Sequence, residues 1–119
     1  MNENQELVKF IIEGIQEKKG KKISVVDLSG IEDTICKYLV ICQGNSPSQV
    51  GAITDSVKEH VRKNIGYKPS ATDGTQNCIW VALDYIDVIV HIFVPDARSF
   101  YDIENLWKDA EIEEIPDID

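Results

Sequence analysis

Residues 78–107 read CIWVALDYIDVIVHIFVPDARSFYDIENLW, and this stretch decides the fold. Two apolar runs, 78–83 and 87–94, flank a very short connection, which predicts a β-hairpin. Pro95 ends the second run, because proline cannot continue a strand ladder. The residues after it predict a helix over 96–110 with its first residue, an Asp, as the N-cap.

The hairpin is predicted to have two different faces. A turn centred on Tyr85 and Ile86 pairs Trp80 with His91 across the strands. Side chains alternate along a strand, so one face is wholly aliphatic and is expected to face the core. The members of this face are Ile79, Val81, Leu83, Val88, Val90 and Ile92. The opposite face carries Trp80, Ala82, Ile89, His91 and Phe93, with Asp84 and Asp87 opposed at the turn.

The face that carries Trp80, His91 and Phe93 is too apolar and too aromatic for an ordinary solvent-exposed surface. One interpretation is that a helix covers it, as in sheets that are buried on both sides. The other is a docking platform for a protein, since aromatic residues are concentrated at interface hot spots. The opposed carboxylates Asp84 and Asp87 fit turn chemistry, but they also suit the approach of a basic group.

The remainder of the chain predicts two further helices and two further strands. Apolar residues at helical spacing indicate a helix over 7–19, and short apolar runs at 23–28 and 38–42 indicate strands. Ser46, followed by Pro47 and then Gln49, is typical of a capping box that opens a long helix ending at residue 65.

The predicted order is α-β-β-α-β-β-α, which belongs to the α/β (α+β) class: a single mixed β-sheet packed with helices. We expect one domain over residues 1–110. The acidic tail over 111–119 is expected to be flexible.

The net charge and the cysteine content indicate which kind of partner and which cellular compartment to expect. The chain has 119 residues, with 21 acidic against 12 basic residues and a net charge of −9. Tight nucleic-acid binding is therefore not expected, and a basic protein partner is favoured. Three scattered cysteines and the lack of an apolar run of about 20 residues predict a cytoplasmic protein without membrane contact.

Catalytic and metal-binding motifs are not found in the sequence. The histidines and cysteines are scattered, so no metal, cofactor or catalytic residue is predicted. Gly44, Asn45 and Ser46 precede a capped helix, whose N-terminus could hold a phosphate. A nucleotide- or phosphate-handling transferase is therefore the alternative function. Another alternative is a regulatory dimer that uses the aromatic face for self-association.

The motif from Trp80 to Phe93 resembles the ribosomal silencing factor (Iojap-like) family, whose pattern is W-x-x-x-D-Y-G-D-x-x-V-H-x-F. The following helix resembles the family's R-x-x-Y-x-L-E-x-L-W, and residues 27–29 and 44–46 match its D-x-S and T-G-x-S stretches. The resemblance covers residues 5 to 110. Two positions depart from the pattern: Gln43 replaces Thr, and Ile86 replaces Gly. We therefore expect the turn to avoid the type that favours positive φ at Ile86.

The resemblance implies a nucleotidyltransferase-like fold without the catalytic carboxylates, and hence no enzymatic activity. It implies binding to ribosomal protein L-fourteen of the large ribosomal subunit, which blocks joining of the small subunit and represses translation when nutrients are short. Homodimers are also implied. The expected partner-binding residues are Trp80, His91 and Phe93 as anchors, with Asp84, Tyr85, Arg98 and Tyr101 at the rim. Leu106 and Trp107 are expected in the core.

Overall fold

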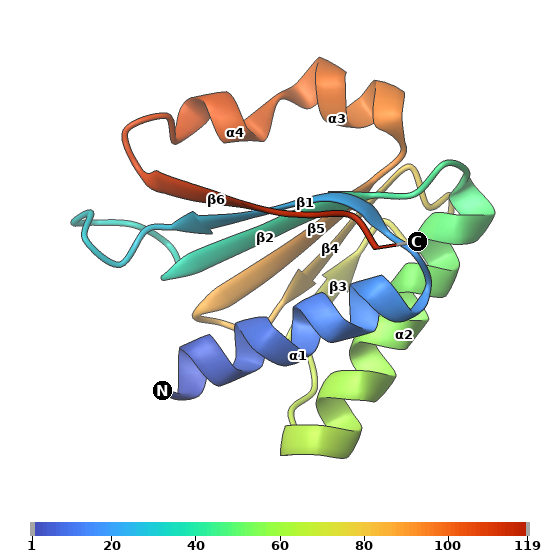
Figure 1. The fold of residues 1–119 in the computed structure, drawn as a ribbon, viewed down its shortest axis with the longest axis horizontal. Coiled ribbons are helices and arrows are strands. Elements are labelled where there is room, and N and C mark those ends of the chain that lie inside the picture. The colour runs from blue at the N-terminus through green and yellow to red at the C-terminus, as the bar shows by residue number, and fades with distance from the viewer. Residues whose placement is uncertain (1, 119) are drawn as a thin grey trace.

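A six-stranded mixed sheet forms the centre of the computed structural model, which describes residues 2–118 (Figure 1). The strands lie in the order β3-β4-β5-β2-β1-β6. Strands β2 and β5 are parallel, and the other neighbours are antiparallel. The strands are β1 (Lys21–Asp27), β2 (Tyr38–Gln43), β3 (Ala71–Asp73), β4 (Trp80–Asp84), β5 (Val88–Phe93) and β6 (Glu111–Ile115).

Helices cover both faces of the sheet, which confirms the predicted mixed architecture (Figure 1). The helices are α1 (Glu3–Glu17), α2 (Pro47–Ile65), α3 (Pro95–Tyr101) and α4 (Ile103–Leu106). One core lies between the sheet and α1 with α2, and a smaller one lies beneath α3 and α4. The aliphatic face of the hairpin lies in the first core as predicted, except that Ile79 precedes β4 and is 38% exposed.

The start of α2 agrees with the predicted cap in part. The Ser46 hydroxyl accepts a hydrogen bond from the backbone N–H of Gln49 at 3.1 Å, with Pro47 at the first helical position. The Gln49 side chain accepts from Asn45 N–H at 2.7 Å rather than from Ser46. Its amide group also donates to the carbonyls of Lys18 and Lys19. This side chain therefore joins the end of α1 to the start of α2.

The register of the hairpin differs from the predicted one by two residues. Trp80 pairs with Phe93 rather than His91, and Asp84 pairs with Ile89 rather than Asp87. The turn lies one residue later because Tyr85 closes it by donating its N–H to the carbonyl of Val88. A shift of two preserves the side-chain alternation, so both predicted faces keep their members.

Ile86 has a φ of 76°, which contradicts the expectation that the turn avoids positive φ there. The Asp84 carboxylate accepts a hydrogen bond from the Ile86 N–H at 2.7 Å. This bond holds a β-branched residue in the left-handed region, where such residues are genuine outliers. The turn therefore keeps a glycine-like conformation without a glycine.

The predicted final helix is broken in two. Val94 is the N-cap rather than Asp96, and Pro95 occupies the first helical position. Asp102, with a φ of 44°, separates α3 from α4. The break rotates the second segment, so Leu106 is 74% exposed rather than in the core. Trp107 packs against the smaller core as expected.

The acidic tail contains a strand instead of being flexible throughout. Residues of β6 pair antiparallel with β1, with Ile115 opposite Ile23 and packed against the larger core. The Asp117 carboxylate then accepts a hydrogen bond from the Lys22 N–H at 2.8 Å. The tail is ordered by its backbone pairing with β1 and by the contact of Ile115 with the core. The final residue of the predicted tail lies outside the described residues.

Candidate functional site

Four aromatic side chains meet on the α3 side of the sheet, and we call them the aromatic cluster: Trp80, His91, Phe93 and Tyr101. The Trp80 ring stacks on Phe93 at 5.0 Å between centroids and lies 4.6 Å from Tyr101. His91 lies 5.7 Å from Trp80 and 6.1 Å from Phe93. The cluster brings together β4, β5 and the end of α3, as the pattern in the sequence predicted for the two strands.

A side-chain hydrogen bond fixes the orientation of Trp80 and His91. The indole Nε1–H of Trp80 donates to Nδ1 of His91 at 2.9 Å. An indole N–H can only donate, so Nδ1 must be unprotonated and the proton of neutral His91 must lie on Nε2. The pair therefore presents one defined donor, the Nε2–H of His91.

Burial keeps His91 neutral. It lowers the pKa of the imidazole from 6.5 to about 4, because the charged form would lose its hydration. The bond from Trp80 acts in the same sense, since protonated Nδ1 has no lone pair to accept it. At neutral pH this side chain is a hydrogen-bonding group and not a charge.

The cluster is covered only in part. Phe93 is fully buried beneath α3 with Ala97, whereas Tyr101 is 48% exposed. Trp80 and His91 are half-buried. Beside them Phe100 is 81% exposed and meets Tyr101 edge-on at 5.1 Å. The two interpretations of this face, a covering helix and an accessible docking surface, therefore each apply to a part of it. Helix α3 covers Phe93, whereas the outer rings remain accessible.

Phe100 also belongs to this surface. One continuous helix over 96–110, as the sequence predicts, would place Phe100 on the same supporting side as Trp107. The helix instead ends at Tyr101, and Phe100 then points to solvent. The residue that signals the break is Asp102, since Asp tolerates the left-handed conformation better than most residues.

Arg98 is used within the fold. Its guanidinium forms two hydrogen bonds of 3.1 Å with the carboxylate of Glu104. The remaining N–H groups donate to the carbonyl of Lys22, to Ser24 Oγ and to Gln43 Oε1. Burial opposes the charge of Glu104, but its bonds to Arg98 lower the pKa of the carboxyl. Arg98 therefore fixes α3 and α4 to the sheet and has little capacity left for a partner.

Asp84 and Tyr85 are placed by the turn. Asp84 is half-buried and holds the Ile86 N–H, as turn chemistry requires. Tyr85 is only 8% exposed and packs in the core on the α1 side. Its hydroxyl has no hydrogen-bond partner among the described residues, and burial raises its pKa to about 12. These two residues lie apart from the aromatic cluster.

The helix N-terminus at Gly44, Asn45 and Ser46 is closed by its own side chains. The N–H groups of Asn45 and Gln49 already donate to Gln49 Oε1 and Ser46 Oγ. Within residues 2–118 no three His, Cys, Asp or Glu side chains gather as a metal site would require. Over the same residues, none of the helices has the length and apolarity needed to cross a membrane.

Comparison with known proteins assigns the family. The family model described as "Ribosomal silencing factor during starvation" matches residues 1–119. A ribosomal silencing factor of Halalkalibacterium halodurans is 36% identical over 107 residues, covering 90% of each chain. One of Bacillus subtilis is 34% identical over 109 residues, 92% of this chain and 91% of its own. A crystal structure from Chromobacterium violaceum has a TM-score of 0.83 at 34% identity, covering 90% of this chain and 88% of that one.

These matches define a class of regulatory proteins rather than enzymes, as the sequence analysis predicted. The chain belongs to the ribosomal silencing factor family. The resemblance that its hairpin and following helix indicated is therefore confirmed. Chloroplast Iojap proteins of Zea mays and Arabidopsis thaliana also match, each 31% identical over 80 residues.

Proposed function

We propose that this protein represses translation by binding the large ribosomal subunit through ribosomal protein L-fourteen, where it sterically blocks joining of the small subunit. Nutrient limitation is the condition in which it acts, and the cytoplasm is its location. The observation that carries the proposal is the accessible part of the aromatic cluster on a chain that matches the silencing-factor family throughout.

The accessible rings have the properties of an interface core. Trp80 is held by His91 and stacked on Phe93, so little side-chain entropy is lost when a partner covers it. Tyr101 and Phe100 add exposed aromatic area next to it. Partner contact is therefore assigned to Trp80, His91, Tyr101 and Phe100. Phe93 supports them from below, and Arg98 holds α3 in place.

The charge of the protein suits this partner class. A net charge of −9 favours encounter with a basic ribosomal protein and disfavours contact with bare RNA. A body of this size bound at the subunit interface excludes the second subunit by volume. The mechanism requires tight docking and no chemical step.

Co-sedimentation with isolated large subunits tests the proposal. The wild-type protein should pellet with large subunits and reduce the yield of complete ribosomes when small subunits are added. The double variant F100A/Y101A should bind at least about tenfold more weakly, since each aromatic anchor contributes about 1 kcal/mol or more. Tyr67→Ala is the matched control, because Tyr67 is 40% exposed after α2, outside the aromatic cluster.

Absence of wild-type co-sedimentation at both low and moderate salt would refute ribosome binding. Full binding by F100A/Y101A would leave ribosome binding intact but refute this surface. Self-association is the competing use of the same rings. If native mass spectrometry shows a dimer that F100A/Y101A dissociates while ribosome binding is unchanged, the surface is a dimer interface and not the ribosome-binding one.

A further inference from the structure

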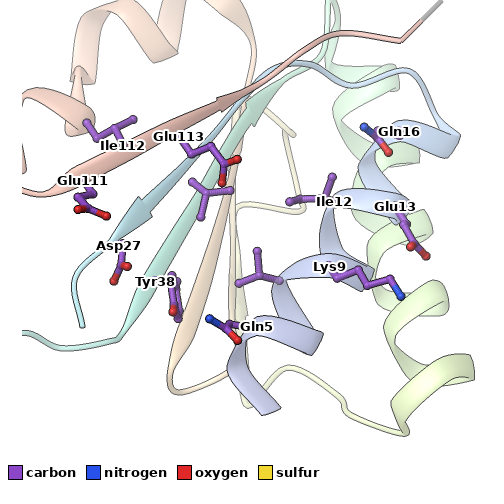
Figure 2. Close-up of a pocket in the computed structure, with 12 residues that line it drawn as sticks. Gln5, Lys9, Ile12, Glu13, Gln16, Asp27, Tyr38, Glu111, Ile112 and Glu113 are labelled. Atoms are coloured by element: carbon purple, nitrogen blue, oxygen red, sulfur yellow. The ribbon is translucent and has the colours of Figure 1, made fainter. Parts of the chain in front are cut away.

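On the face of the sheet opposite the aromatic cluster, a groove of about 830 Å³ lies between α1 and the strands β1 and β6. Figure 2 shows residues of α1 on one side of this groove and residues of the two strands on the other. Its floor is apolar and includes Val8, Ile12 and Val25.

The groove lies over the part of the sheet that α1 and α2 do not cover. Strands are spaced about 4.8 Å apart and packed helices 8–10 Å apart, so one helix covers about two strands. Helices α1 and α2 pack over β2, β5 and β4. Among residues 2–118 no third helix lies over β1 and β6 on this face (Figure 1). The groove therefore lies where a third helix could pack beside α1 on this face of the sheet.

Carboxylates line the strand side of the groove. The side chains of Asp27, Glu111 and Glu113 lie on this face with Val25, because Asp27 pairs with Glu111 and Val25 with Glu113. Lys9 also contributes to the lining, but Figure 2 shows its side chain pointing away from the sheet. The groove thus combines an apolar floor with an acidic wall.

The pairing of Asp27 with Glu111 indicates the charge of the occupant. Like charges directly opposed on neighbouring strands destabilise the pair, and a cation placed between them removes that repulsion. A second copy of this chain, also carrying −9, would be repelled from an acidic wall.

We propose that this groove binds a basic amphipathic helix of a protein partner. Apolar side chains at helical spacing would lie on Val8, Ile12 and Val25, and flanking lysines or arginines would pair with Glu111, Glu113 and Asp27. The groove and the aromatic cluster lie on opposite faces of the sheet. Both can therefore be occupied at once, and this site does not depend on the function proposed above.

A peptide titration of the isotope-labelled protein, followed by NMR, tests the site. The probe is a synthetic leucine–lysine peptide of about 15 residues with leucine at helical spacing, which is long enough to form a helix. We expect micromolar binding that weakens with added salt, with the largest shift changes around Ile12, Val25 and Glu113. A scrambled peptide of the same composition should bind at least about tenfold more weakly.

Two neighbouring substitutions separate the groove from overall charge. Glu113→Lys reverses a carboxylate on the groove face, and Glu114→Lys reverses one on the opposite face, where Glu114 pairs with Ser24. Both residues are exposed, and both variants change the net charge equally. Glu113→Lys should weaken the peptide about fivefold and Glu114→Lys less than about twofold.

Equal weakening by the two variants, or equal binding of the scrambled peptide, would show attraction to overall charge and overturn the proposal. Shift changes centred on Trp80 and Tyr101 would place the peptide on the other face and also overturn it. Peptide binding should be retained by F100A/Y101A. Failure of ribosome binding and failure of groove binding are thereby distinguished.

Discussion

The indole N–H of Trp80 and the Nδ1 atom of His91 lie 2.9 Å apart across β4 and β5. The two residues are diagonal neighbours, because Trp80 pairs with Phe93 and His91 with Ala82. A diagonal contact is within reach of an aromatic side chain on one face of a sheet. The hydrogen bond therefore depends on the observed register, and it links the position of Trp80 to the protonation state of His91.

The first prediction concerns pH. The pKa of His91 is lowered to about 4, whereas the unfolded chain binds its proton near pH 6.5. The resulting stability is fully present above pH 6.5 and is lost as pH falls toward 4, because only the unfolded state gains a proton in that interval. The contribution is on the order of 3 kcal/mol.

Urea unfolding of wild type and His91→Asn at pH 7, 6 and 5 measures this contribution. The free-energy difference between the two proteins should shrink as the pH falls, since asparagine does not titrate. An NMR titration that showed the His91 imidazole protonating near pH 6.5 in the folded protein would contradict the prediction.

The second prediction concerns Arg98, which joins α3 and α4 to β1 and β2. The side chains of Arg98 and Glu104 are only 13% and 26% exposed. Arg98→Ala leaves this carboxylate without its partner and should lower the free energy of unfolding by about 3 kcal/mol. Arg98→Lys should recover less than half of the loss, because an ammonium cannot form the paired bonds of a guanidinium.

Arg62→Ala is the control for removing an arginine ion pair. The Arg62–Glu59 pair has the same close geometry, but its side chains are 51% and 56% exposed. Its loss should cost about 0.5 kcal/mol in denaturant titrations. Equal effects of the two alanine variants would show that the Arg98 interactions do not stabilise the fold.

The third prediction concerns Ile86, the residue at positive φ in the hairpin turn. The left-handed conformation costs a non-glycine residue about 1–2 kcal/mol, and glycine is free of this cost. Ile86 is 67% exposed, so little buried area is lost on substitution. Ile86→Gly should therefore raise the free energy of unfolding by about 1 kcal/mol after the entropy of the more flexible unfolded chain is included.

Ile86→Ala distinguishes conformation from side-chain size. Alanine also lacks the isoleucine side chain but retains the Cβ atom that disfavours positive φ. It should leave the thermal midpoint close to that of wild type. An increase in the midpoint with alanine equal to that with glycine would mean that backbone conformation is not the cause.

The sequence was sufficient to predict features that depend on local patterns. The two hairpin faces follow from the alternation of side chains along a strand. The predicted register was wrong by two residues, but a shift of two leaves each side chain on the same face, so the predicted faces were correct. The N-cap of α2 at Ser46 follows from three signals within four residues, which are Ser46 itself, Pro47 and Gln49. The position of Trp80 and His91 on one face of the hairpin was predictable in the same way, although their direct pairing was not.

Features that depend on distant partners were not predictable from local patterns. The tail became a strand because β1, about 90 residues earlier in the chain, offers it an edge. Arg98 was assigned to the surface because nothing near it in sequence indicates Lys22, Ser24 or Gln43 as partners. The break at Asp102, which exposes Phe100, interrupts an otherwise helical pattern.

The fourth prediction concerns thiol reactivity. Cys36 and Cys42 are buried, and desolvation raises their pKa values to about 11 and about 12. Few of these groups are thiolates at pH 8, and the thiolate is the reactive form. Cys78 is only partly buried. A disulfide reagent should therefore modify one thiol quickly in the folded protein and three after denaturation, and Cys78→Ser should remove the fast phase.

The fifth prediction concerns β6 as part of the folded domain. A chain that ends at Ala110 lacks the partner of β1 and the buried contacts of Ile115. It should be less stable by a few kcal/mol and more prone to aggregate through the open edge of β1. Ile115→Ala, which keeps the strand but removes its main core contact, should lose about 1–2 kcal/mol.

Ile118→Ala is the control for the single substitution. Ile118 is 44% exposed and lies beyond the strand, so its truncation should change the free energy of unfolding by less than about 0.5 kcal/mol. Amide hydrogen exchange provides an independent measure, since amides bonded to β1 should exchange slowly and those in a frayed tail at once. If the truncated chain is as stable as the full one, and if the amides of residues 111–115 in the full chain exchange fast, this segment is the flexible tail that its composition suggests.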